Sequence, residues 1–496
     1  MKKLLALFLL LASVLCFAAC PGGQNPGTTP GGDDETEVDY LDNVGSHDFG
    51  GETVTFSAMS SYAYEIYYEE EKPDDCDVQI LQRNRRLESR FNIEIVSDYQ
   101  AGDDANTHRA RVNMALSNGD VTFDVAMVQI WMTGPLITDG YFLDLRHEIP
   151  YVKDSMGNVE WWSDDINIAY TIYGRQFVGI SDINLSAIKV TWAYLFNKGM
   201  EQEYNIASGL GYESLYDMVR KGAWTLDNVR GIVKDFYLDS DTDGIIGQKD
   251  EADTYGLLSS GSWWTDVASA ACGIRFITND GETTPEITPF TSFAGIVNGL
   301  SDLALSNGFF TPTATSAIDK FAQGTALMVM TTLGSLEGDT IHDSDVDFGV
   351  LPFPKADANQ TAYHSGSQDA MTSLEVPTTV EGRVEMVGAV LEALSAESHR
   401  VVLPSYYELI LKSKNTRDQE SLEMIDIIYE GRLYDFASIH SYNQDELYVA
   451  ATNGGLMYVM RHFINNPTSV ANVWESASRA LGIRLGEIVK KYENMY

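Results

Sequence analysis

The sequence predicts an α/β protein whose parallel sheets are doubly wound. Strand and helix patterns alternate in the first structured stretch, and a second α/β region begins near Phe177. The chain has 496 residues. The part that follows the N-terminal leader and linker, about 450 residues, exceeds one typical hydrophobic core, so two lobes are expected.

The first stretch has the order β-α-β-α-β. Hydrophobic periodicity predicts strands at residues 53–58, 92–97 and 123–129, and helices at 78–91 and 109–116. The third strand is apolar enough to be buried on both faces. This order predicts a parallel sheet, in which ligands bind beyond the carboxyl ends of the strands. The loops at 59–68 and 130–135 occupy that edge.

The second region also contains predicted strands and helices, and no internal sequence repeat relates it to the first. Strands are predicted at residues 177–180, 192–196, 326–330 and 348–351. Thr225 is placed to cap a helix at its N-terminus. Amphipathic helices are predicted at residues 383–394 and 420–428.

The N-terminus predicts export from the cytoplasm. Lys2 and Lys3 precede an apolar run that ends at Phe17, which indicates a signal peptide over residues 1–19. Cys20 directly follows two alanines, an arrangement that resembles a bacterial lipobox, although Phe17 stands where Leu is usual. We expect Cys20 to carry the lipid; the alternative is an ordinary secreted protein that is cut nearby.

The residues after Cys20 predict a flexible tether. From Pro21 to Glu37 nearly every residue is Pro, Gly, Thr, Asn, Asp or Glu. Such a segment buries too little apolar surface to offset the entropy lost on ordering. We therefore assign residues 20–45 to a lipid-anchored tether.

Composition excludes several partners. The formal net charge is −39, so nucleic acid and anionic lipid surfaces are repelled. No segment after the leader has the length of apolar sequence that spans a membrane. The cysteines after Cys20, Cys76 and Cys272, form neither a disulfide framework nor a metal-ligand spacing, and whether they pair is open.

One acidic loop has the spacing of a calcium site. Carboxylates at alternate positions of a tight turn converge on a cation, and a glycine at position 6 permits the bend. The candidate ligands are Asp239, Asp241, Asp243, the carbonyl of Ile245 and Asp250. A structural Ca²⁺ is expected, and the alternative is a solvated acidic turn.

The sequence contains no motif of a nucleophilic, metal-dependent or phosphate-binding catalytic site, so we expect a protein that is not an enzyme and needs no cofactor for chemistry. With 72 acidic residues, a glycosidase pair of carboxylates stays open as an alternative.

Short segments along nearly the whole mature chain carry a family resemblance. They are Arg83-Asn84-Arg85, Phe123-Asp124-Val125, Phe196-Asn197-Lys198, Trp224-Thr225-Leu226-Asp227, Phe348 to Lys355, and Leu391 to Glu408. In order and spacing they resemble the extracellular solute-binding lipoproteins of ABC importers, carbohydrate type (family 1).

The resemblance implies the type II periplasmic-binding fold: two doubly wound α/β lobes joined by a multi-strand hinge, with the ligand between them. Crossings are expected near residues 179–186, near Pro352 and after about residue 415. Lobe 1 would then hold residues 46–180 and 353–415, and lobe 2 residues 181–352 and 416–496.

Aromatic residues in the predicted cleft loops are candidates for ligand binding. A pyranose has apolar C–H faces and a polar rim, so its receptors combine flat aromatic platforms with hydrogen-bonding side chains. The candidates are Tyr62, Tyr64, Trp131, Trp263, Trp264, Tyr363, His364 and Tyr406, together with Asp182 at the first expected crossing. Packing in the core is the alternative for each aromatic residue, and an N-cap or turn is the alternative for Asp182.

These observations predict a receptor anchored in the cell membrane by lipid and exposed outside the cytoplasm. It would act as a monomer that captures a carbohydrate, with an oligosaccharide favoured, and delivers it to the transmembrane subunits of an ABC permease. Two alternatives remain: a binding protein for a non-sugar solute such as a peptide, and a secreted glycoside-active enzyme.

Overall fold

The computed structural model describes residues 41–67, 75–244, 250–411, 419–442, 446–450 and 454–495. The predicted signal peptide, most of the tether and Cys20 lie outside these residues. Leu41 and Val44 are buried against the first sheet, so the folded unit already includes residues that we assigned to the end of the tether. None of the described helices combines the length and the apolar character needed to cross a membrane.

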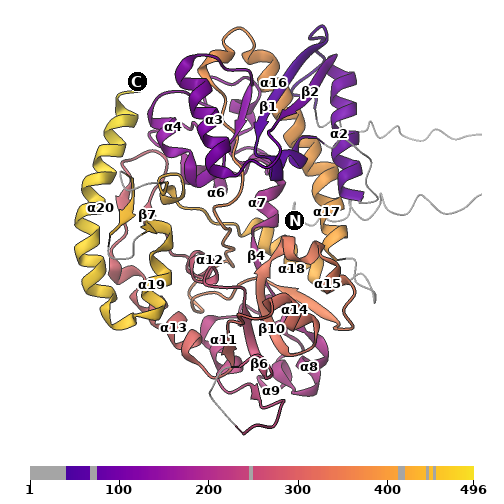
Figure 1. The fold of residues 1–496 in the computed structure, drawn as a ribbon, viewed down its shortest axis with the longest axis vertical. Coiled ribbons are helices and arrows are strands. Elements are labelled where there is room, and N and C mark those ends of the chain that lie inside the picture. The colour runs from indigo at the N-terminus through magenta and orange to yellow at the C-terminus, as the bar shows by residue number, and fades with distance from the viewer. Residues whose placement is uncertain are drawn as a thin grey trace, which may run out of the picture. The chain divides into compact units, whose positions relative to one another are not determined.

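The first sheet has the predicted parallel order. Its strands are β1 (Glu52–Ala58), β2 (Ile93–Asp98) and β3 (Val125–Met127), arranged β2-β1-β3. Helices α2 (Asp75–Phe91) and α16 (Val384–Glu397) pack on one face, and α3 (Ala105–Asn118) packs on the other (Figure 1). Both faces are therefore covered, as a doubly wound sheet requires.

The side chains of β3 show why this strand is apolar throughout. Val125 and Met127 belong to the cluster with α2 and α16, whereas Ala126 and Val128 belong to the cluster that contains the apolar residues of α3. Successive side chains of a strand point to opposite faces, so both sets must be apolar when both faces are buried.

The second sheet is mixed, not purely parallel. Its central strands are β4 (Trp192–Asn197), β10 (Ala326–Thr332) and β6 (Thr254–Ser259), and β4 runs antiparallel to β10. The order is β11-β4-β10-β6-β5, with β11 at Phe348–Leu351, β5 at Tyr237–Leu238, and β9 (Phe309–Phe310) paired with β6. The expected cap is present, since the Thr225 hydroxyl accepts the N–H of Asn228 and opens α11 (Leu226–Val233).

Several further helices lie near the crossings or pack around the second sheet region. They are α4 (Gly134–Thr138), α7 (Leu185–Lys189), α12 (Trp264–Ala271), α13 (Ala294–Leu305), α17 (Leu403–Ile410), α18 (Gln419–Glu430), α19 (Val459–Asn465) and α20 (Val470–Glu493). Figure 1 shows α12 and α19 near each other, at the edge of the second sheet region.

The predicted strand at residues 177–180 forms only a single bridge, between Gly179 and Leu374. The backbone N–H of Ile180 donates to the Asn167 side chain at 3.0 Å, so no ladder can extend there. This segment nonetheless lies where the chain leaves the first sheet, as expected for a crossing.

A second crossing occurs at residues 366–372. Ser367 still pairs with Thr191 beside the second sheet, whereas Thr372 pairs with Gln129 at the end of the first. The expectation placed this crossing near Pro352, but Lys355 remains paired with Thr225 in the second region. The proposed lobe boundaries otherwise stay a prediction.

A buried carboxyl ties both crossings to the loop after β1. Glu65 is fully buried and accepts the backbone N–H of Ser186 at 2.6 Å and the hydroxyl of Thr372 at 2.5 Å. Burial raises the pKa of Glu65 to about 7, although the hydrogen bonds oppose the rise. The folded protein therefore favours the protonated form of this group.

Glu65→Gln should remove a pH dependence of stability. The stabilisation from a protonated Glu65 is fully present below the ordinary pKa of 4.5 and is lost as the pH rises through about 7. Glutamine does not ionise, so the Glu65→Gln variant should not lose this stabilisation. As the pH rises across that range, the free energy of unfolding of the variant should increase by about 3 kcal/mol relative to that of the wild type. Urea unfolding at several pH values measures the difference. The exposed Glu381→Gln is the control, and parallel pH curves for wild type and Glu65→Gln would contradict the assignment.

Candidate functional site

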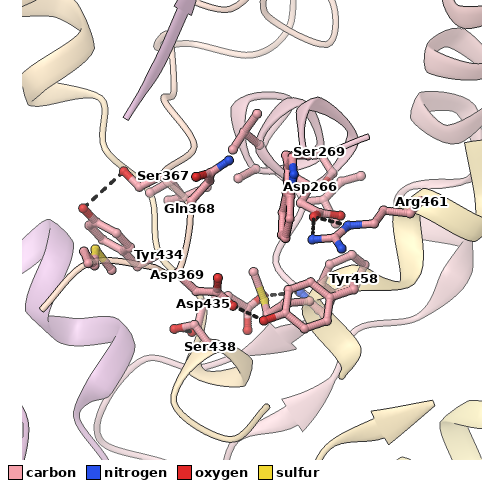
Figure 2. A pocket seen from close by; sticks show the side chains of 18 residues that line it. Asp266, Ser269, Ser367, Gln368, Asp369, Tyr434, Asp435, Ser438, Tyr458 and Arg461 are labelled. Atoms are coloured by element: carbon pink, nitrogen blue, oxygen red, sulfur yellow. Dashed lines mark hydrogen bonds and ion pairs between the residues drawn. The ribbon is translucent and has the colours of Figure 1, made fainter. Parts of the chain in front are cut away.

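A cavity lies between α12 and the second crossing. Its walls are residues 263–276, residues 367–371 of the crossing, residues 433–438 that follow α18, and residues 457–461 at the start of α19 (Figure 2). The cavity volume is about 40 Å³, room for a few water molecules. A sugar ring enters only if these walls move apart.

An ion pair between two aromatic rings forms one wall. The guanidinium of Arg461 donates to Asp266 from Nε at 2.7 Å, and its Nη2 lies 2.6 Å from the same oxygen. The Arg461 Cζ lies 4.1 Å from the centre of the Trp263 ring and 4.5 Å from that of Tyr458. Cation–π contact and the carboxylate together fix the guanidinium.

Trp263 presents an aromatic surface at this wall. Its side chain is 45% exposed although Arg461 covers one part of it, so it offers a flat apolar face to solvent. The neighbouring Trp264 is buried and packs on Phe309 with ring centres 5.2 Å apart. Consecutive residues at the start of α12 thus divide into one exposed ring and one core ring.

Three carboxylates face the cavity, and their partners differ. Asp266 is paired with Arg461; burial raises its pKa, and the guanidinium opposes that rise. Asp435 accepts backbone N–H groups of Phe276, Ile277 and Ala437. Asp369 accepts the Tyr458 hydroxyl (Figure 2). Burial raises the pKa of Asp369 as well.

Residues that follow β1 and β3 contact the crossing segment at Ala370, which lies between the cavity-lining residues Asp369 and Met371. The Tyr62 hydroxyl donates to the Ala370 carbonyl, and Gln129 Nε2 donates to the same oxygen at 3.4 Å. Trp131 Nε1 in turn donates to Gln129 Oε1 at 3.0 Å. Tyr62 and Trp131 therefore lie beside this site, although neither lines the cavity.

The other candidate residues lie elsewhere. Tyr64 packs against a hydrophobic cluster in which Tyr406 is fully buried. Lys189 Nζ lies 4.4 Å from the centre of the Tyr64 ring. The Tyr363 hydroxyl donates to the Val219 carbonyl at 3.0 Å. His364 is half-buried; burial, together with Arg275, lowers its pKa. None of these four residues lines the cavity.

Asp182 joins helices at the first crossing and does not line the cavity. Its carboxylate accepts the Tyr429 hydroxyl at 2.8 Å and lies 2.7 Å from His399 Nδ1. Burial lowers the pKa of His399, but the hydrogen bond and charge of Asp182 and the nearby Glu160 outweigh it, so the pKa is raised. The contact links α18 to the π-helical turn at Ser398–Val402.

Trp263 was predicted from the sequence, but the residues that accompany it were not. Asp266 lies three positions later on the same helix, a spacing that places two side chains on one face. Tyr458 and Arg461 show the same spacing, but nothing in the sequence relates them to α12, because the Arg461–Asp266 contact spans 195 residues. Asp369 had no distinguishing pattern.

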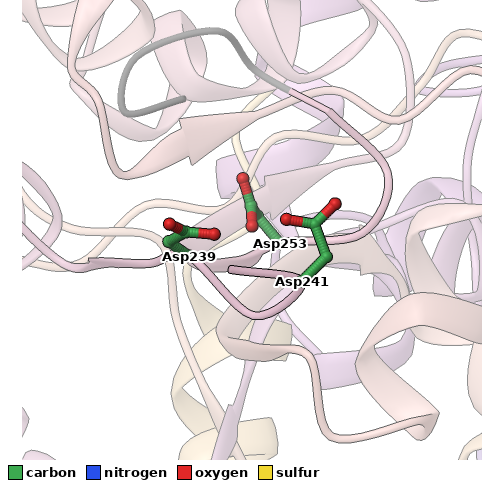
Figure 3. A group of neighbouring side chains, drawn as sticks. All are labelled: Asp239, Asp241 and Asp253. Carbon is green, nitrogen blue, oxygen red and sulfur yellow. The ribbon is translucent and has the colours of Figure 1, made fainter. Parts of the chain in front are cut away.

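The acidic loop brings its carboxylates together. Oxygens of Asp239, Asp241 and Asp253 lie within 4.8 Å of one another (Figure 3), as do those of Asp241, Asp243 and Asp250. Gly244 has φ of 77°, the conformation that the tight turn requires. Ile245 lies outside the described residues. Asp253 was not predicted, because it falls beyond the twelve-residue spacing.

The electrostatics of this loop would suit a cation. The backbone N–H of Asp243 lowers the pKa of Asp241, but desolvation and the carboxylates of Asp243, Asp250 and Asp253 outweigh it, so the pKa is raised. Mutual repulsion of this kind is relieved when a divalent ion binds. The residues present fit the oxygen ligands that Ca²⁺ prefers.

Comparison with known proteins gives a fold but no close relative. No protein-family model matches the chain, and no curated protein matches it. Solved structures do match. The cyclic α-maltosyl-1,6-maltose binding protein of Arthrobacter globiformis has a TM-score of 0.53 at 14% identity, over 88% of this chain and 99% of that one.

Two further solved structures agree with this match. The apo form of RafE from Streptococcus pneumoniae has a TM-score of 0.52 at 12% identity, over 88% of this chain and 98% of that one. An ABC substrate-binding protein from Listeria monocytogenes, in complex with cycloalternan, has a TM-score of 0.51 at 12% identity, over 88% and 99%. The chain therefore has the fold of these substrate-binding proteins, which confirms the predicted fold class.

Proposed function

We propose that this protein is an extracytoplasmic receptor that binds a carbohydrate and delivers it to an ABC permease. The observation that carries the proposal is the wall formed by Trp263, Arg461, Asp266 and Tyr458. It combines an exposed aromatic face with charged hydrogen-bonding groups, the combination that a pyranose requires. The fold supports it too, since similar structures include proteins that bind cyclic maltosyl-maltose and cycloalternan.

The proposal includes a change of conformation. The cavity is too small for a sugar, and the segments that form it belong to the second sheet region and to a crossing. Rotation about the crossings would widen the space, and closure over the ligand would exclude water. The closed form would then dock on the permease. The protein itself would carry out no reaction.

The proposal also includes the anchor. Cleavage before Cys20 and lipidation of its side chain would place residues 20–40 between the membrane and the folded unit that begins at Leu41. A monomer tethered in this way can reach a permease in the same membrane. This arrangement rests on the sequence of the leader and the composition of the segment that follows it.

Removing the aromatic face should weaken sugar binding. Trp263→Ala should reduce the affinity of a bound glycan by about tenfold, because a stacked ring contributes about 1–1.5 kcal/mol in addition to its buried area. A thermal-shift screen of residues 21–496 against mono- and oligosaccharides, amino acids and peptides first identifies the ligand, and titration calorimetry then compares the variants.

Tyr204→Ala is the matched control for this test, because that ring is 40% exposed and does not line the cavity. Equal glycan affinities for wild type and Trp263→Ala would show that this cavity wall is not part of the binding site. A response to peptides alone would favour the non-sugar receptor. Release of reducing sugar from glycans would favour the enzyme.

We also propose that the acidic loop holds a structural Ca²⁺ ion. Millimolar Ca²⁺ should raise the melting temperature after treatment with EGTA, since an ion that binds only the folded state stabilises it. Asp241→Asn should abolish this rise, because Asp241 belongs to both carboxylate groups. The exposed Asp345→Asn is the control for a general effect of acidic charge. A rise of the same size in both variants would show that the loop is not a specific site.

A further inference from the structure

One carboxylate that lines the cavity, Asp369, forms no ion pair among the described residues, although the charge of Arg461 acts on it from a distance. Among the residues that the structure describes, no lysine, arginine or histidine forms an ion pair with Asp369, whereas Asp266 is paired with Arg461. The Tyr458 hydroxyl donates to one oxygen of Asp369. A carboxylate has about four acceptor positions, so most of the hydrogen-bonding capacity of Asp369 is unused.

The other charges of the cavity are compensated. The Arg461 guanidinium is held by Asp266 and lies against the rings of Trp263 and Tyr458. Asp435 accepts three backbone N–H groups. The lining therefore has three carboxylates and one guanidinium. Asp369 is compensated only in part, by the Tyr458 hydroxyl and by the charge of Arg461, whose guanidinium is paired with Asp266.

We infer that Asp369 makes the site select a sugar that bears a protonated amine over the same sugar with a hydroxyl at that position. The inference rests on the proposed carbohydrate function and names the class of carbohydrate. A carboxylate is stabilised more by an ammonium than by a hydroxyl, because the ammonium adds the attraction of a full positive charge to the hydrogen bond, and that attraction is strong where water is excluded. Burial raises the pKa of Asp369, and the hydrogen bond from Tyr458 and the charge of Arg461 oppose that rise only in part.

The position of Asp369 suits this role. It belongs to the crossing segment, directly before Ala370, whose carbonyl accepts hydrogen bonds from Tyr62 and Gln129. Tyr458, its hydrogen-bond donor, also covers Arg461. Figure 2 shows the side chains of Asp369 and Tyr458 directed toward each other within the cavity wall. An amine bound there would contact the crossing and an aromatic ring together, which favours cation–π contact as well.

Anionic sugars should be excluded by the same arrangement. A uronate would bring a second carboxylate toward Asp369, and the guanidinium in the cavity is already engaged by Asp266. Like charges in a site of low dielectric repel strongly. The expected order of affinity is therefore amino sugar, then neutral sugar, then uronate.

The test compares sugars that differ in one group. Glucosamine, galactosamine and mannosamine are paired with glucose, galactose and mannose, and the β-1,4 disaccharide of glucosamine is paired with cellobiose. In whichever pair binds, calorimetry on residues 21–496 should show that the amino sugar has an affinity about tenfold higher than that of the matched hydroxyl sugar. Salt at about 0.3 M suppresses attraction by the distant charges of this acidic chain.

Asp369→Asn should remove the preference and leave the neutral sugar bound within about threefold of wild type. Asparagine keeps the size and an acceptor oxygen for Tyr458, so the cavity should keep its shape. Asp120→Asn, an exposed residue outside the cavity, removes the same charge from the chain and should keep the preference.

The outcomes separate this inference from the proposed function. Neutral and amino sugars that bind equally to wild type would overturn the inference and leave the carbohydrate function standing. A preference that persists in Asp369→Asn would also overturn it. If no sugar of either kind binds, the proposed function fails first and the inference fails with it.

Discussion

One buried carboxyl determines how the parts of this molecule meet. Glu65 follows the first strand, and its two oxygens accept hydrogen bonds from Ser186 and Thr372, one in each crossing. Thr372 lies three residues after Asp369, so the wall of the cavity is positioned by the same contact. A buried polar group of this kind is costly unless every partner is present, which holds the loop after β1 against both crossings.

The first sheet could be predicted from the sequence because its signals are local. The apolar run of β3 and the one-sided pattern of α2 arise from burial on adjacent elements. The second sheet was harder, since the antiparallel pairing of β4 with β10 joins strands about 130 residues apart and leaves no local trace. A tertiary contact also explains why residues 177–180 do not form the predicted strand. Their apolar periodicity is present, but the backbone N–H of Ile180 donates to the Asn167 side chain and is not available for a sheet.

The candidate site was predicted less well, because its residues come together only through the fold. Trp263 and Tyr406 are both aromatic residues in predicted cleft loops, yet one is 45% exposed at the cavity and the other is fully buried. Sequence composition does not separate these environments. The acidic loop is the opposite case: a contiguous spacing brought its carboxylates together as expected, and only Asp253 had to be added from the structure.

The separation between Asp266 and Arg461 affects how the protein folds. Asp266 precedes its counter-ion by 195 residues, so α12 cannot bury that carboxylate at low cost until the segment that forms α19 is available to pack. The second sheet region therefore completes its packing late, by a contact of high sequence separation, and such contacts form slowly. A chain in which α19 has not yet packed would expose the apolar faces of α12 and α13 to chaperones and proteases.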